Sequence, residues 1–209
     1  DAEGKSIDRE ESRGRWRIRT GDGDYSAAVV VNAAGAWCDE VARMAGLTPI
    51  GLVPKRRTAM TFDGPPGHDT RAWPIVLDVD EDFYFRPDAG RLMASPADET
   101  PSPPCDAQPE EEDIAILIDK LERATDMKVN KIAAKWAGLR SFVADNSPVA
   151  GFDADGKGFF WLAGQGGFGI MTSPALGRLS AALIEGKPIP ADIADCGVTA
   201  KALSPSRLR

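Results

Sequence analysis

The glycines between Gly164 and Gly169 are the residues best placed to do chemistry in this chain. Residues 159–163 before them are apolar, as in a buried strand, and a helical pattern follows them. Glycines let the backbone approach a ligand closely, and the first amides of a helix favour negative charge. The segment therefore predicts a strand, a turn and a helix that hold an anionic or electron-rich group. The alternative is a turn that binds nothing.

The helix after this turn is bounded by residues typical of helix ends. We expect Ser173 to cap its start, Pro174 to lie in its first turn, and Gly186 to end it. The spacing G-x-G-x-x-G of residues 164–169 is also that of dinucleotide-binding turns. We reject this interpretation, because in such turns the helix begins among the glycines, about four residues earlier than expected here, and a second parallel strand follows.

The composition is typical of a soluble, intracellular, enzyme-like chain and indicates little more. The 209 residues include 32 acidic and 25 basic ones, which gives a net charge of −7 without a basic stripe. This argues against nucleic acid or an anionic membrane surface as a partner. No apolar run is long enough to span a membrane, and no signal peptide is evident. We therefore expect a cytoplasmic protein that binds neither nucleic acid nor membranes.

The thiol and imidazole groups of the chain point to no metal site or catalytic triad. Cys38, Cys105 and Cys196 are odd in number and scattered, so we expect reduced thiols without a metal. His68 is the only histidine and lies in a proline-rich segment typical of an exposed loop. A Ser-His-Asp triad would have to use it, which this position does not favour.

The residues before and after Asn32 predict a hairpin, a buried strand and a short helix. Residues 15–20 alternate like a strand, and residues 25–31 are expected to pair back on them after a turn. Residues 28–31 are continuously apolar, as in a strand buried on both faces. A small-residue turn and a helix to about residue 45 follow, with Gly46 as its end.

The middle of the chain predicts strands and one helix. We expect strands at residues 52–62 and 73–79, a hairpin at 83–94 and a further strand near 131–137. Pro109 is expected to open a helix with acidic residues in its first turn. The apolar face of this helix consists of Ile114, Leu117, Ile118 and Leu121.

Together these elements predict an α/β chain of mixed α+β type, with a sheet-rich insert. One buried strand ends in a small-residue turn near the start of the chain, and another ends in the glycine turn near its end. Two such strand ends lying side by side would build a ligand crevice at the carboxyl edge of a sheet, with the insert as its lid. We expect residues 1–51 and 136–209 to form one domain and residues 52–135 the insert.

Five segments of the chain form an ordered set of motifs. They are 29–37 (VVVNAAGAW), 83–94 (FYFRPDAGRLMA), 136–151 (WAGLR, then DNSPVAG), 164–183 (the glycine turn and its helix) and 203–208 (LSPSRL). In this order they resemble the flavin-dependent amine and amino-acid oxidoreductases of the D-amino acid oxidase, glycine oxidase and sarcosine oxidase superfamily. The resemblance covers nearly the whole chain.

The resemblance implies a noncovalently bound FAD, since no cysteine stands at the covalent flavin position of some relatives. It implies that residues 1–51 and 136–209 form part of an FAD-binding domain, and that residues 52–135 form a substrate-binding domain. The cofactor-binding residues that it implies are Ala33, Ala34, Gly35 and Trp37 in the first turn, and Gln165, Gly166, Gly167, Phe168, Gly169 and Ile170 in the glycine turn.

The implied reaction is oxidation of the C–N bond of a small-molecule amino acid or secondary amine by hydride transfer to flavin. It needs orientation more than an acid or base, so no catalytic residue is assigned. The resemblance points to Arg140 as the group that holds a substrate carboxylate, with Arg56 next in line, because arginine can donate two parallel hydrogen bonds. Tyr84 can offer its hydroxyl to the same substrate. The alternatives are a surface or ion-paired Arg140 and a Tyr84 in the core or in solvent.

Two features depart from the family pattern. The N-terminal strand–G-x-G-x-x-G–helix unit of the family is missing from the sequence, so we expect the isolated chain to bind little or no FAD. Arg57 stands where the family has the glycine of Pro-x-Arg-Gly, which bears on the local backbone and on substrate fit. The alternative function is a non-catalytic substrate-binding or interaction module that cannot hold flavin by itself.

Overall fold

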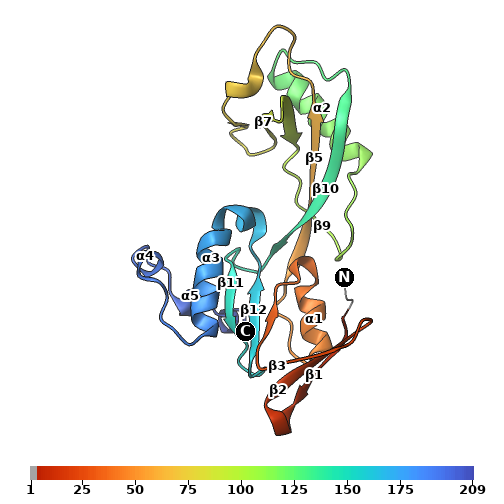
Figure 1. Ribbon diagram of the computed structural model, residues 1–209. Coiled ribbons are helices and arrows are strands. Elements are labelled where there is room, and N and C mark those ends of the chain that lie inside the picture. Colours follow the sequence, from red (N-terminus) through yellow and green to blue (C-terminus); the bar gives the residue numbers. More distant parts are fainter. Residues whose placement is uncertain (1–3) are drawn as a thin grey trace. The chain divides into compact units, whose positions relative to one another are not determined.

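The computed structural model describes residues 4–209, and the chain divides into two compact units (Figure 1). The first unit combines residues 1–53 and 140–209, and the second unit consists of residues 54–139. The corresponding insert was expected at residues 52–135. Each unit has its own sheets and core, and each is described by itself.

The first unit opens with an antiparallel meander of β1 (Gly4–Glu10), β2 (Arg15–Thr20) and β3 (Asp24–Ala27). A 3-10 turn at Glu11–Arg13 joins β1 to β2. The prediction that residues 25–31 form one strand is wrong, because β3 ends at Ala27 and β4 (Val30–Asn32) belongs to another sheet.

The second sheet of this unit has the order β11-β12-β4, with β11 at Val149–Phe152 and β12 at Phe159–Ala163. β4 runs parallel to β12, with Val30 opposite Phe159, so the two apolar strands expected to meet do share a sheet. Complete burial of residues 28–31 is not observed: Val31 is 43% exposed, since β4 is an edge strand in the described sheet.

Helices cover both faces of this sheet (Figure 1). On one face, Phe160 packs with Leu176 and Leu179 of α3 (Gly169–Ile184). On the other, Phe159 and Trp161 pack with α1 (Cys38–Met44) and with the meander. The remaining short helices are α4 (Ala191–Ala194), α5 (Ala200–Leu203) and the 3-10 turns Gly35–Trp37, Gly166–Phe168 and Pro205–Leu208.

The start of α3 differs from the prediction. The helix begins at Gly169, four residues before Ser173, so Ser173 does not cap it. Pro174 therefore lies inside the helix instead of in its first turn. Proline lacks the N–H that would bond to the carbonyl four residues earlier, and the Ser173 hydroxyl donates to that carbonyl, Ile170 O, at 2.9 Å. Gly186 ends the helix with a φ of 68°, as predicted.

Two reasons were given above for rejecting a dinucleotide-binding turn, and the structure supports only one of them. The helix does begin among the glycines, which contradicts the first ground. The second ground holds, because residues 187–209 form α4, α5 and a 3-10 turn and contain no strand.

The second unit is built on one sheet with the order β10-β5-β8-β7-β6, and β9 pairs with β5. Its strands are β5 (Val53–Phe62), β6 (Val76–Leu77), β7 (Tyr84–Asp88), β8 (Arg91–Ser95), β9 (Thr100–Pro101) and β10 (Ile132–Phe142), with a 3-10 turn at Thr70–Ala72. The predicted hairpin is confirmed, and its turn, Ala89-Gly90, has positive φ at both residues, as a two-residue hairpin loop requires. The strand expected at 73–79 is reduced to Val76–Leu77.

One helix, α2 (Glu111–Ala124), packs on this sheet. It begins two residues after Pro109, with Glu110 at the N-cap position. Its predicted apolar face is confirmed: Ile114, Leu117 and Leu121 are buried against side chains of the sheet. The sheet residues in this core include Met60, Phe62, Phe85, Leu92 and Ala94.

Candidate functional site

Two strand ends of the first unit meet at one edge of its sheet. Asn32 at the end of β4 lies opposite Trp161 near the end of β12, and the strands are parallel. The turns that follow them, 33–35 and 164–168, therefore start from the same carboxyl edge, which is where ligands bind in open α/β sheets. These two turns contain most of the residues that the sequence assigned to a cofactor.

The first turn is held by a side chain that the sequence did not single out. Asn32 is buried, and its Nδ2 donates to Cys38 O at 2.8 Å, while its Oδ1 accepts from Ala34 N at 3.4 Å. Gly35 has a φ of 57° and opens the 3-10 turn that leads to the partly exposed Trp37. An asparagine directly after an apolar strand is the sequence signal for such a bracket.

The glycine turn leaves the start of a helix without a side-chain cap. Neither the 3-10 turn Gly166–Phe168 nor α3 has a capping side chain. Phe168, Ile170 and Met171 around it are largely exposed. Uncapped amides beside exposed apolar side chains fit a group with a flat apolar body and a negative edge, which is the character of a flavin ring.

Arg140 lies against this turn. Its guanidinium fills the space beside Gly167: a Cβ on that glycine would lie 3.0 Å from Nη2 and 3.1 Å from Cζ of Arg140. A glycine at position 167 is what leaves room for the cation. The structure therefore brings together two residues, 27 positions apart in the sequence (167 against 140), that were each assigned to the site separately.

Phe142 is a neighbour of the turn that the sequence analysis missed. A Cβ on Gly166, which has a φ of 53°, would lie 2.6 Å from Phe142 Cε1. Phe142 follows Arg140 by two residues in β10, and residues two apart in a strand lie on the same face. This alternation could have identified it.

The Cys38 thiol at the start of α1 is fully buried. Burial is the main cause that raises its pKa to about 12, and hydrogen bonding with the backbone of Ala34 opposes that shift. The group is therefore a neutral thiol at ordinary pH. Within residues 4–209, no three His, Cys, Asp or Glu side chains gather as a metal ion would require. The described helices include none with the length and apolar character of a membrane span.

In the second unit, the two expected substrate residues lie on opposite faces of the sheet. Phe85, Ala94 and Met60 are paired neighbours and belong to the core under α2. Side chains alternate along strands, so Tyr84 and its neighbour Ser95 lie on the face opposite α2, which we call the distal face. Tyr84 is half-buried there.

Arg56, in contrast, points towards α2. Its Nη1 donates to Glu110 Oε1 at 2.9 Å and its Nη2 to Asp113 Oδ2 at 2.8 Å. These carboxylates pair the two terminal nitrogens of the guanidinium. Through these two contacts Arg56 ties β5 to the first turn of α2, while its Nε is buried and has no hydrogen-bond partner among the described residues.

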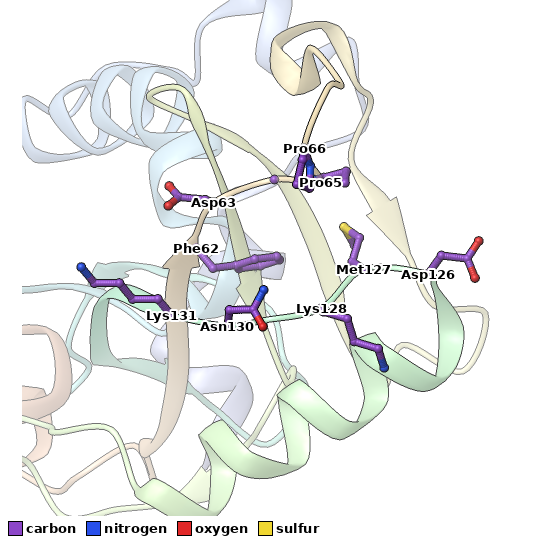
Figure 2. A pocket seen from close by; sticks show the side chains of 10 residues that line it. Phe62, Asp63, Pro65, Pro66, Asp126, Met127, Lys128, Asn130 and Lys131 are labelled. Atoms are coloured by element: carbon purple, nitrogen blue, oxygen red, sulfur yellow. The ribbon is translucent and has the colours of Figure 1, made fainter.

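A cavity of about 310 Å³ lies between residues 62–66 and residues 126–131, which follow the C-terminal end of α2. Figure 2 shows Phe62 and Met127 at this cavity, while Lys128 and Lys131 extend away from each other. Lys128 is paired with Glu122 at 2.9 Å. The walls of the cavity include the core side chains Phe62 and Met127 and no residue of the distal face named above.

Comparisons with known proteins identify the family of the chain. The family described as "FAD dependent oxidoreductase" matches residues 2–183. Glycine oxidase of Geobacillus kaustophilus (strain HTA426) is 27% identical over 193 residues, which cover 91% of this chain and 49% of the relative. FAD-dependent oxidoreductase domain-containing protein 1 of Xenopus laevis is 30% identical over 179 residues, which cover 75% of this chain and 34% of the relative.

A solved structure shows a similar fold. L-proline dehydrogenase from P. horikoshii superposes with a TM-score of 0.78 at 25% identity, covering 99% of this chain and 53% of that chain. The chain thus spans about a third to a half of the length of the curated relatives named above. The family match extends over most of the sequence, and the two strand ends with their turns supply a site that suits a flavin. The chain therefore belongs to the FAD-dependent oxidoreductase family.

Proposed function

We propose that the complete natural protein oxidises the C–N bond of an amino acid or secondary amine. FAD, when bound, supplies the acceptor for the hydride that leaves the carbon next to nitrogen. The relatives support an amino-acid substrate, since one is named a glycine oxidase and a similar structure is an L-proline dehydrogenase. In this proposal the first unit holds the flavin and the second unit contributes to substrate binding.

The residues of the two turns are proposed to hold the flavin noncovalently. Ala33, Ala34 and Gly35 follow β4, Trp37 lies partly exposed after them, and Gln165 to Ile170 follow β12. The uncapped amides at the start of α3 would face the edge of the flavin that becomes negative on reduction.

The observation that carries the proposal is the position of Arg140 beside Gly167. It places a fork of N–H donors at the same turn that is proposed to hold the flavin. A guanidinium binds a carboxylate through two parallel hydrogen bonds, and this fixes the direction in which an amino acid presents its α-carbon. Tyr84 is proposed to donate its hydroxyl to the substrate from the distal face of the second unit. Arg56 stays next in line for a carboxylate: its Nη1 and Nη2 are paired with Glu110 and Asp113, and its Nε has no hydrogen-bond partner among the described residues.

The first test is an absorbance spectrum of the complete natural protein, followed by glycine, sarcosine and D-amino acids without oxygen. Bleaching of the flavin by any of them supports the proposal. A protein that carries no flavin, or a flavin that none of these amines reduces, would favour a non-catalytic binding module instead.

The second test is substitution of Arg140 by lysine and by alanine. We expect both variants to keep their flavin but to lose kcat/KM for the amino acid, by about 2–5 kcal/mol of transition-state binding for alanine. Lysine should already be clearly impaired, because it keeps the charge but not the planar fork. Near-normal kcat/KM in both variants would show that Arg140 is structural.

A further inference from the structure

The glycine turn rests on one short segment, residues 140–143, which belongs to the same compact unit. At three glycines of the turn, the space that a Cβ would need is taken by a side chain of this segment. The three pairs are Gly164 with Val143, Gly166 with Phe142 and Gly167 with Arg140. The segment and the turn therefore run along each other in opposite directions, and the backbone of the turn follows the side chains of the segment.

The closest of these contacts is made by the ring of Phe142. A Cβ on Gly166 would lie 2.6 Å from Cε1, 3.0 Å from Cδ1 and 3.2 Å from Cζ of that ring. Carbon atoms in contact are usually about 3.5–4.0 Å apart, so a side chain at position 166 does not fit beside the ring. Gly166 also has a φ of 53°, in the left-handed region that glycine adopts without strain. The ring and the conformation of the turn both require glycine here.

Core packing does not account for the position of this ring. Phe142 is half-buried, and none of the three buried apolar clusters of the described residues includes it. Its neighbour Val143, in contrast, is 3% exposed and belongs to the core of the first unit. A phenylalanine outside the core, with one edge of its ring against a glycine, indicates a role in the shape of the turn.

The backbone that Phe142 supports leads directly into the uncapped start of α3. Gly166 opens the 3-10 turn that ends at Phe168, and α3 begins at the next residue. Amides in this stretch stabilise a negative charge best when they are held in one orientation, because their dipoles then need no rearrangement when the charge develops. Support of Gly166 therefore bears on the electrostatics of the proposed flavin site.

We propose that Phe142 is a positioning residue of the flavin site. Its ring holds the backbone at Gly166 and thereby fixes the uncapped amides that follow, which favour a flavin with a negative edge over a neutral one. The inference rests on the proposed function and deepens it. It names a residue of β10 that raises the midpoint potential of the bound flavin, and that acts through the turn instead of through the substrate.

The test is the midpoint potential of the flavin in the complete natural protein, measured without substrate. Phe142→Ala should lower this potential by about 30 mV, which for a two-electron couple means that reduced flavin binds about tenfold more weakly relative to oxidised flavin. Phe142→Leu keeps part of the side-chain volume and should give a smaller shift in the same direction. An unchanged potential in Phe142→Ala would overturn the proposal.

Phe152 provides the matched control, because it is a partly exposed phenylalanine of β11 in the same unit. Its ring packs edge-on against Phe160, with 5.1 Å between the ring centroids. The two residues are paired near the start of β12, whereas the glycine turn follows the end of that strand. Phe152→Ala should leave the potential unchanged. Equal shifts in the two alanine variants would mean that the loss of any aromatic ring changes the potential, which contradicts a specific role of Phe142.

A double substitution tests the contact itself by thermal unfolding, independently of the potential. Gly166→Ala places a methyl group against the ring and strains the backbone, so it should lower the thermal midpoint. In a Phe142→Ala background only the strain remains, and the same substitution should lower the midpoint less. Equal losses in both backgrounds would show that the ring does not fill the space beside Gly166, and the proposal would then be wrong.

The possible failures are distinguishable. If amines reduce the flavin and Phe142→Ala keeps the wild-type potential, the role of Phe142 is wrong and the proposed function stands. If a flavin is present but no amine reduces it, the proposed oxidation is wrong, and the potential still decides the role of Phe142. If the complete protein carries no flavin, both are wrong. Circular dichroism shows whether the alanine variant is folded, and Phe142→Leu takes its place if it is not, an unchanged potential again being the contrary result.

Discussion

At the scale of single residues, the site depends on the absence of a side chain at Gly167. A methyl group there would lie 3.0–3.2 Å from three atoms of the Arg140 guanidinium, which is the flexible end of its side chain. The arginine can therefore give way without disturbing the backbone. Unlike Gly166, Gly167 has a negative φ, so alanine is not strained at this position.

We predict that Gly167→Ala impairs substrate use without lowering stability. Alanine should leave the free energy of unfolding unchanged or raise it by about 0.4–1 kcal/mol, because the unfolded chain loses freedom. Displacement of the guanidinium should lower kcat/KM about tenfold, since small misplacements weaken a bidentate contact. The measurements are thermal unfolding and steady-state kinetics on the complete protein.

Gly177 provides the matched control, because it lies in α3 with open space around its Cα. Gly177→Ala should leave kcat/KM unchanged. In an Arg140→Ala background, Gly167→Ala should have no further effect, because the two changes act through the same group. A tenfold loss that persists in that background would contradict the mechanism.

At the scale of elements, α2 supports the sheet that carries Tyr84 and Arg57. Leu117 is fully buried against that sheet, whereas its neighbour Ile116, about 100° further round the helix, is 42% exposed. The contrast between these neighbours separates the contribution of packing from that of helix propensity.

We predict that Leu117→Ala lowers the free energy of unfolding by about 2–5 kcal/mol, because it removes buried surface and leaves a cavity. Ile116→Ala should change it by no more than about 0.5 kcal/mol. Urea unfolding of both variants checks the difference. Equal losses would mean that α2 does not pack on the sheet as described.

At the scale of the whole molecule, the last motif of the chain holds an earlier motif of the same unit. Arg207 donates to Asp145 Oδ2 at 2.7 Å, to Ser147 O at 2.7 Å and to Pro148 O at 3.2 Å. These residues belong to the DNSPVAG and LSPSRL segments, which the sequence presented as separate motifs. This contact joins two parts of the first unit that lie 62 residues apart in the sequence.

The same contact makes the unit sensitive to acid. Hydrogen bonds from the Arg207 side chain, and then from the Ser147 amide, lower the pKa of Asp145. Burial is the largest single influence on Asp153 and raises its pKa. The hydrogen bonds to this carboxylate together outweigh burial, so the pKa of Asp153 is lowered as well. A carboxyl group with a lowered folded-state pKa stabilises the protein above its unfolded pKa of about 4, and this contribution is lost as the pH falls through the folded value.

We predict that the thermal midpoint falls as the pH is lowered from about 4 towards 2. Arg207→Gln should destabilise the protein by about 1–3 kcal/mol at pH 7, and its difference from the wild type should shrink in acid. Arg13→Gln breaks an exposed 3.7 Å ion pair and should change the midpoint little. A difference for Arg207→Gln that stays constant down to pH 2 would show that the Asp145 charge is not involved.

Local patterns in the sequence were enough for several elements. The Ala89-Gly90 hairpin, the apolar face of α2 and the ends of α1 and α3 at Gly46 and Gly186 are all confirmed. Each depends on residues within a few positions of one another, because turn conformation and side-chain periodicity are local properties. The same is true of the α/β fold class and of the family motifs, which are contiguous in the sequence.

Only the tertiary structure decided the partners of these elements. β4 leaves the meander because its apolar residues pair with β12, which lies more than a hundred residues later. Ser173 and Pro174 are accommodated inside α3 because a side-chain hydroxyl replaces a lost backbone bond. Arg56 turns to α2 and Arg140 to Gly167 for the same reason: an arginine is placed by acceptors and free space that come from distant segments, and no local pattern contains them.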